Sequence, residues 1–152
     1  MNALTLLKED HALIKKLLAE GEQTTERGEK TRTELFERLK EILTTHERME
    51  EEVLYPALKA HPKARDLALE GYQEHHVVDL IFEELAATPV TDEKWGAKFK
   101  VAKENIEHHI EEEESDMFEA TRRAFESDQL EKMGERMAEI KSLAKQVQAP
   151  EG

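Results

Sequence analysis

The chain of 152 residues contains no cysteine. Without a thiol it cannot form a disulfide framework, a thiolate nucleophile or an iron-sulfur ligand, so any metal must be held by imidazole and carboxylate groups. Glycine and proline are also scarce, with six and four residues, and aromatic residues make up only 5% of the chain. Because charged residues contribute 38%, this composition favours long helices over β-sheets.

Positive charge is scarce relative to negative charge. The chain has 22 lysines and arginines but 35 aspartates and glutamates, which gives a net charge of −13. Long-range repulsion argues against a nucleic-acid partner or an anionic membrane surface. No stretch approaches the ~18 apolar residues of a membrane span, and the N-terminal segment lacks the apolar core and cleavage site of a signal peptide. We therefore expect a cytoplasmic protein with no nucleic-acid partner and no membrane partner.

Apolar residues recur at spacings of three and four, which predicts amphipathic helices. We expect helices over residues 3–23, 31–60 and 64–87, a fourth that begins after Asp92 and carries Met117, and a shorter fifth over 128–147. Pro56 lacks a backbone donor and should kink or end the second helix.

Four long helices with short connections predict an all-α fold, an antiparallel up-down four-helix bundle. We assign residues 1–126 to the bundle and residues 127–152 to a C-terminal segment, whose short helix packs on or beside the bundle. Its last four residues, APEG, are expected to fray.

Four of the seven histidines fall in register with the apolar stripes, one on each long helix. Positions three and four apart share a helix face. His109 therefore shares a face with Ile106, whereas its neighbour His108 does not, and the same test favours His75 over His76. The histidines in register are His11, His46, His75 and His109.

Two of these histidines are followed four residues later by a glutamate in the same register, His46 by Glu50 and His109 by Glu113. The histidines are 35 residues apart in the first half and 34 in the second, so the chain consists of two helix hairpins related by a pseudo-twofold axis. This arrangement suits two metal ions, because each glutamate can bridge both ions while the histidines bind at their outer sides. Imidazole and carboxylate ligands of this kind suit iron. Two carboxylates buried without a metal or cations would cost several kcal/mol.

From His11 to Phe118 these residues resemble the hemerythrin-like family of HHE cation-binding domains. The matching motifs are DHALIKKLL, HERMEEEVLYPAL, EHHVVDLIFEEL and HHIEEEESDMF. The resemblance implies a four-helix bundle around two non-haem iron ions joined by an oxo or hydroxo bridge. It further implies that the centre binds or reacts with dioxygen, peroxide or nitric oxide. The implied metal ligands are His11, His46, Glu50, His75, His109 and Glu113.

The sequence departs from the oxygen-carrying hemerythrins, which use five histidines and a bridging aspartate five residues after the last one. Here Glu113 follows His109 by four, and the third helix has no second histidine: Asp79 lies four residues after His75 and Gly71 four residues before it. One nitrogen ligand is missing, which leaves two coordination positions for solvent, substrate or an extra ligand. The candidates for an extra ligand are Asp79, Tyr55 and His76. Two of these residues have an alternative role that does not involve the metal. Asp79 would be a solvated carboxylate, and Tyr55 would be a packed aromatic residue with a hydrogen-bonded hydroxyl.

The open positions favour redox reactivity or sensing over reversible carriage of oxygen. An enzyme of this type would decompose peroxide, as a catalase or peroxidase does, or act as an oxidase. Two alternatives stay open. One is an iron-sulfur cluster repair protein, whose family members carry a cysteine-bearing N-terminal segment that this chain lacks. The other is an iron storage or sensing protein without turnover, with the fifth helix as a partner surface.

Overall fold

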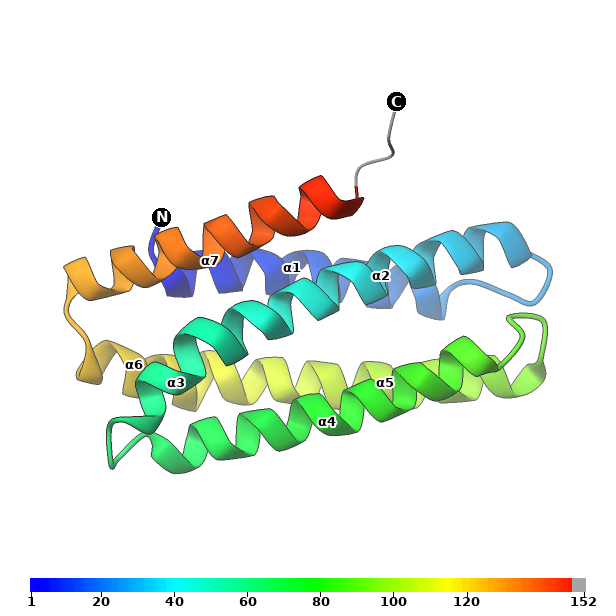
Figure 1. Cartoon of the computed structure of the whole chain (residues 1–152). Helices are drawn as coiled ribbons and strands as arrows, with labels where there is room; N and C mark the ends of the chain where they lie inside the picture. The colour runs from blue at the N-terminus through cyan, green and yellow to red at the C-terminus, as the bar shows by residue number, and fades with distance from the viewer. Residues whose placement is uncertain (149–152) are drawn as a thin grey trace.

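The computed structural model describes residues 1–148 and contains helices and no strand in that range. Its elements are α1 (Ala3–Glu22), α2 (Glu29–Met49), η1 (Glu50–Leu54), α3 (Tyr55–Lys59), α4 (Arg65–Ala87), α5 (Glu93–Glu112), η2 (Glu113–Met117), α6 (Phe118–Ala124) and α7 (Ser127–Gln148). Figure 1 shows α1, α2, α4 and α5 running along one another as a bundle, with α7 lying over α1 and α2. The predicted all-α four-helix bundle with a further C-terminal helix is confirmed. The predicted fraying concerns residues 149–152, outside the described range.

Side-chain caps define where two of the bundle helices begin. The side chain of Asn2 accepts a hydrogen bond from the backbone amide of Thr5 at 2.9 Å, at the start of α1. Asp92 accepts one from the amide of Lys94 at 2.8 Å, so α5 begins where the sequence predicted. Each cap satisfies an amide that has no partner inside its helix.

Arg32 joins two loops at the end of the bundle opposite the start of α7. Its guanidinium donates hydrogen bonds to the carbonyl oxygens of Thr24 at 2.9 Å and Val90 at 2.6 Å, and lies 4.5 Å above the ring of Trp95. The side chain therefore links the α1–α2 loop to the α4–α5 loop and closes the apolar core beneath it.

Two π-helical segments, η1 and η2, interrupt the predicted second and fourth helices. Each begins at a predicted metal ligand, Glu50 in η1 and Glu113 in η2. Pro56 lies in the first turn of α3, directly after η1, where its missing amide is tolerated. Because η2 contains no proline, Pro56 cannot account for both π segments, and the feature that they share is the glutamate at which each begins.

A polar layer divides the apolar core into two clusters. One cluster lies where α7 meets the bundle and includes Leu7, Met49, Leu54, Leu58 and Met137. The other lies toward the Arg32 end and includes Ile14, Leu39, Phe82, Trp95 and Phe99. The layer between them consists of buried histidines and glutamates.

The C-terminal helix α7 is part of this core. Leu130, Met133 and Met137 are buried in the first cluster. Gly134 lies so close to the N-terminus that a Cβ atom at this position would stand 2.1 Å from the carbonyl oxygen of Met1. With 22 residues, α7 is as long as the bundle helices. No helix within residues 1–148 combines the length and the apolar character needed to cross a membrane.

Candidate metal centre

The structure brings all six predicted ligands together in the polar layer. Each comes from a different element, and none is more than 8% exposed. They are His11 of α1, His46 of α2, Glu50 of η1, His75 of α4, His109 of α5 and Glu113 of η2. The helical register predicted this convergence, because it placed one histidine of each bundle helix on the inner face.

Glu50 lies among three imidazoles, each with its Nε2 atom directed to the carboxylate. Glu50 Oε1 is 3.0 Å from His75 Nε2, 3.5 Å from His46 Nε2 and 3.9 Å from His109 Nε2. Its second oxygen, Oε2, is buried and has no hydrogen-bond partner among the described residues. The carboxylate therefore borders both halves of the cluster and retains acceptor capacity.

Glu113 occupies the corresponding position in the second half. Its Oε1 lies 3.0 Å from His11 Nε2, and its Oε2 lies 3.2 Å from His109 Nε2. Glu113 thus also contacts one histidine from each half of the chain. Each of the two carboxylates is thus shared between histidines of both halves.

The ligand atoms form two overlapping groups, in each of which all atoms lie within 4.8 Å of one another. The first group is His11, His46, Glu50 and Glu113, and the second is Glu50, His75 and His109. In the part of the chain that is described, the buried Nε2 atoms of His46 and His109 have no hydrogen-bond partner. Buried polar atoms without partners are costly, and a cation within each group would satisfy them. The residues present therefore fit a pair of metal ions.

Each of the four histidines donates from Nδ1 to a carboxylate outside the central group. The pairs are His11 with Glu114 at 2.7 Å, His46 with Asp10 at 3.0 Å, His75 with Glu51 at 3.0 Å and His109 with Glu74 at 3.1 Å. Such a contact fixes the tautomer, so that Nε2 is the free ligand atom, and it orients the ring.

Two of these outer carboxylates, Asp10 and Glu74, lie on bundle helices directly before a histidine and were not identified from the sequence. Each stands directly before a predicted ligand, His11 or His75, yet bonds to the histidine of the neighbouring helix. The repeated acid-histidine pair, 64 residues apart, is the sequence signal that marks them.

The close packing of acids and imidazoles shifts their pKa values in the metal-free protein. Burial alone would lower the pKa of His75, but hydrogen bonds with Glu50 and Glu51 outweigh it and raise the pKa to about 10. Burial would raise the pKa of Glu113, yet its polar contacts, those to His109 and His11 among them, hold it well below the usual range. Metal binding must therefore displace protons from the imidazoles.

Comparison with known proteins agrees with this arrangement. Residues 2–121 match the family model described as Hemerythrin HHE cation binding domain. The chain belongs to this hemerythrin family. A crystal structure of a Hemerythrin HHE cation binding domain-containing protein from Mycobacterium kansasii superimposes with a TM-score of 0.83 and 31% identity, covering 96% of this chain and 89% of that one.

A curated protein from Nostoc sp., described as a DNA nickase, is 27% identical over 146 residues. The match covers 96% of this chain but 41% of that protein. The hemerythrin domain thus spans less than half the length of this relative.

The two halves of this hemerythrin domain differ five residues after Glu50 and Glu113, where one has Tyr55 and the other Phe118. The ring of Tyr55 stacks on His75 at 5.3 Å, and that of Phe118 stacks on His11 at 5.9 Å. In an α-helix, residues five apart point about 140° away from each other, but an i→i+5 bonded π turn stacks them. The π segments therefore bring both aromatic rings to the site. Tyr55 alone carries a hydroxyl, which donates to Glu113 at 3.1 Å.

Of the three candidates for an extra ligand, Tyr55 is the one placed beside the cluster. It is fully buried, and its hydroxyl lies 3.3 Å from His75 Nε2. Gly71 makes room for its ring, because a Cβ atom there would lie 2.6 Å from a ring carbon. Asp79 and His76 are exposed on the outer side of α4. Asp79 contacts Glu47 instead of the central group.

A small cavity of about 20 Å³ adjoins the centre. Its lining combines three histidines, one glutamate and five aliphatic side chains: His46, His75, His109, Glu47, Ile14, Leu43, Val78, Ile106 and Ile110. A space of this size holds one water-sized molecule. Glu47 also borders a surface groove of about 330 Å³ next to Asp79, so it separates the cavity from solvent.

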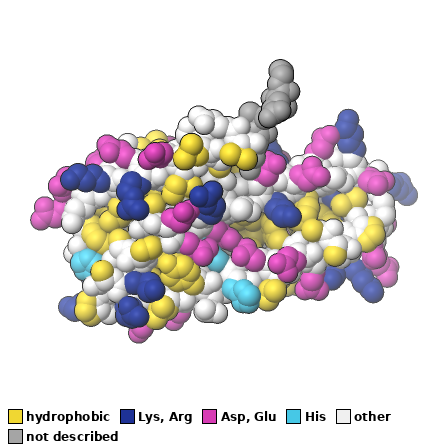
Figure 2. All heavy atoms as spheres, in the orientation of Figure 1, with side chains coloured by type: hydrophobic (Ala, Val, Ile, Leu, Met, Phe, Trp, Pro, Cys, Tyr) yellow, Lys and Arg dark blue, Asp and Glu magenta, His cyan; other side chains and the backbone are white. Residues whose placement is uncertain are grey.

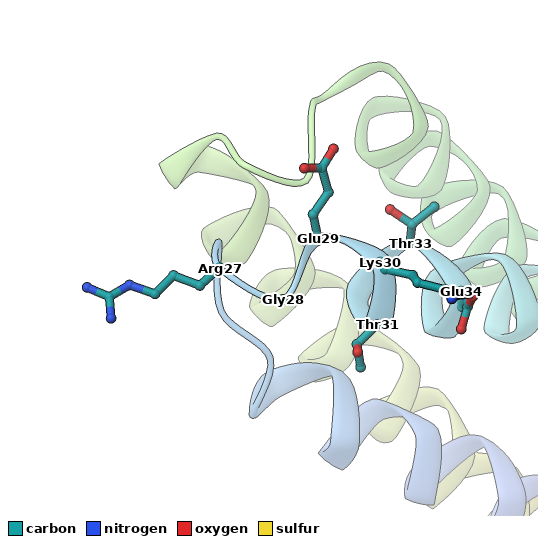
Figure 3. Close-up of a pocket in the computed structure, with 7 residues that line it drawn as sticks. All are labelled: Arg27, Gly28, Glu29, Lys30, Thr31, Thr33 and Glu34. Carbon is teal, nitrogen blue, oxygen red and sulfur yellow. Dashed lines mark ion pairs between the residues drawn. The ribbon is translucent and has the colours of Figure 1, made fainter.

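The depression at the start of α2 is larger, about 700 Å³, but lies at the bundle end away from the histidines. Figure 3 shows that its side chains do not converge, with Arg27 and Glu29 extending in different directions. Lys30 pairs with Glu34 on the same helix at 3.9 Å. The depression therefore contains no group of residues directed at a common ligand.

Proposed function

We propose that the protein is a non-haem di-iron protein that binds or reacts with dioxygen, peroxide or nitric oxide. The observation that supports this most directly is the pair of overlapping ligand groups. Each has two imidazoles, both contain the buried Glu50, and the first also contains the buried Glu113. In the proposed centre Glu50 and Glu113 would be shared by the two ions. His11 and His46 would hold one ion, and His75 and His109 would hold the other.

The side chains around the centre prepare it for a small ligand. When bound, the iron pair would supply redox chemistry and open coordination positions. The outer carboxylates hold the Nδ1 protons of the histidines, which leaves every Nε2 atom free to bind metal. The aliphatic lining of the cavity excludes bulk water and limits the ligand to a few atoms. Tyr55 provides a hydroxyl donor beside one ion.

The surface properties support a role that does not involve nucleic acid. The net charge of −13 repels a polyanion, and Figure 2 shows acidic and basic side chains intermixed over the face in view. The negative charge therefore argues against DNA as a substrate of this domain. A cytoplasmic location and the absence of a membrane partner stay predictions from the sequence.

Iron analysis and optical spectra test the proposal. Protein from iron-replete expression should contain about two iron atoms per chain and absorb visible light. Adding peroxide should change the spectrum. Continued turnover of peroxide would identify an enzyme, whereas a stable, reversible change would identify a carrier or sensor. Slow iron release without a ligand response would favour storage, and protein with a single zinc ion or no metal would contradict the proposal.

A further inference from the structure

Lys141 of the C-terminal helix α7 contacts Asp10, and Asp10 in turn contacts the predicted ligand His46. Lys141 Nζ lies 2.5 Å from Asp10 Oδ1, while Asp10 Oδ2 accepts a hydrogen bond from His46 Nδ1 at 3.0 Å. The Asp10 side chain is only 5% exposed. Lys141 lies beyond residues 2–121, the part of the chain that matches the family. Through this contact α7, which lies outside residues 2–121, is connected to the centre.

The corresponding carboxylate of the second half, Glu74, has different surroundings. It accepts from His109 Nδ1 at 3.1 Å but pairs with no lysine or arginine in residues 1–148. Its neighbours are Glu112 and the exposed His108, which pair with each other at 3.1 Å. The outer carboxylate of one half, Asp10, thus pairs with a lysine of α7, whereas that of the other half, Glu74, does not.

The packing of α7 fixes where Lys141 stands. Met137, one turn before it on the same helix face, is fully buried in the core cluster shared by α7 and the bundle. Gly134 brings the helix backbone close to Met1. Surface ion pairs contribute little when both side chains move freely, but here one partner is buried and the other stands on a packed helix. The Lys141–Asp10 pair is therefore part of the rigid frame.

We propose that Lys141 is a positioning residue for the half of the metal centre formed by His11 and His46, and that α7 makes the two metal positions unequal. Lys141 holds one oxygen of Asp10, which directs the other oxygen to His46 Nδ1. His46 then presents Nε2 to its metal ion. This inference rests on the proposed di-iron centre.

Timed iron release from the full-length, iron-loaded protein to an excess of chelator tests this role. Losing an outer partner of a ligating histidine lowers metal affinity about 10- to 100-fold. Lys141→Met removes only the support of that partner, so one of the two irons should leave up to about tenfold faster, with the other unchanged. Asp10→Asn should accelerate the same iron more strongly.

Two variants separate positioning from a general loss of stability. Lys141→Arg keeps the charge and should restore the wild-type release curve. Lys145→Met is the matched control, because this lysine is exposed on the same helix and has no ion pair among the described residues, so release should not change. Equal acceleration of both irons, or a Lys141→Met curve identical to that of Lys145→Met, would overturn the inference alone. Wild-type protein that does not load two irons would overturn the proposed function and this inference together.

Discussion

At the scale of single residues, one step of helical register separates a predicted ligand from a surface residue. His109 is 8% exposed and directs Nε2 to Glu113. The side chain of the adjacent His108 is 67% exposed and pairs with Glu112. Consecutive residues differ by about 100° around the helix, so only one of the two imidazoles reaches the bundle interior.

His109→Ala should lose much of its iron and visible absorption, because the variant leaves Glu113 as a buried carboxylate with one partner fewer. His108→Ala should retain both irons and at most shift the spectrum slightly. Iron analysis and absorption spectra of the two variants, purified side by side, check this. If only the His108 variant loses its colour, the inward-facing residues of the fourth bundle helix are those one position away from the ones assigned above.

Tyr55→Phe removes the hydroxyl that distinguishes Tyr55 in the first half of the chain from Phe118 in the second. Hydrogen bonds to charged groups contribute about 1.5–3 kcal/mol, so the metal-free variant should lose about 2 kcal/mol of unfolding free energy in denaturant titrations. Tyr72→Phe is the control, because its hydroxyl contacts only a partly buried backbone carbonyl, that of Glu51, at 3.3 Å. A Tyr55 variant as stable as the control would show that the contact with Glu113 contributes nothing.

Glu47 should make the metal-free protein sensitive to alkaline pH. Burial raises the pKa of Glu47 to about 9, and a hydrogen bond with Asp79 adds to this effect. Because the folded-state pKa lies above the unfolded value, the protonated carboxyl stabilises the fold fully below about pH 4.5. That contribution is lost progressively as pH rises toward about 9.

Glu47→Gln mimics the protonated side chain and should therefore change little at pH 4.5 but stabilise the metal-free protein by about 2 kcal/mol at pH 8. Denaturant titrations at the two pH values measure this difference. Glu83→Gln, in an exposed residue of the same groove, should show no such pH dependence. A Gln variant of Glu47 that is equally affected at both pH values would argue against a buried, protonated carboxyl.

At the scale of elements, helix register was predictable from sequence, but the local departures from it were not. The spacing of Leu, Ile and His residues predicts which face of each bundle helix is buried, because that face must repeat every three or four residues. The π segments have no comparable signal, since Glu50–Leu54 and Glu113–Met117 read as ordinary helix. The contacts of Asp10 and Lys141 join helices distant in sequence, and helical spacing within one element does not report on them.

A π turn contains one extra residue relative to an α-helix, so deletion of the exposed Glu52 in η1 should restore α-helix without turning the flanking segments. The metal-free variant should keep its helical circular dichroism and melt within a few degrees of wild type, but hold less iron because Glu50 moves relative to its partners. Deletion of the exposed Glu70, near the start of α4, is the control. It rotates the rest of α4 by about 100° and should unfold the protein. Full iron content after the Glu52 deletion would show that the π turn does not shape the site.

At the scale of the whole molecule, the centre lies between two apolar clusters and joins all four bundle helices. Ions that bind only the folded chain add RT ln(1 + [L]/Kd) to its stability, about 4 kcal/mol at a thousandfold excess over Kd. For a domain of this size that corresponds to a melting temperature about 10 °C lower after iron removal. Calorimetry of iron-loaded and metal-free protein checks this, and identical melting curves would argue against a buried site.

Arg32→Met provides the matched control for the effect of iron on stability. Arg32 closes the bundle end through Thr24 and Val90, away from the histidines. Its loss should lower the unfolding free energy by about 2 kcal/mol in both forms and leave the iron content unchanged.

The pseudo-twofold relation between Glu50 and Glu113, 63 residues apart, has a consequence for protein design and ancestry. Two copies of the first hairpin, associated as a homodimer, would contain the same set of four imidazoles and two bridging carboxylates. Such a dimer would carry a phenol at both metal positions, because Tyr55 would replace Phe118. When the two copies are fused in one chain, each half can change independently. Tyr55 at one half of the centre and Lys141 at the other are differences that two identical hairpins could not have.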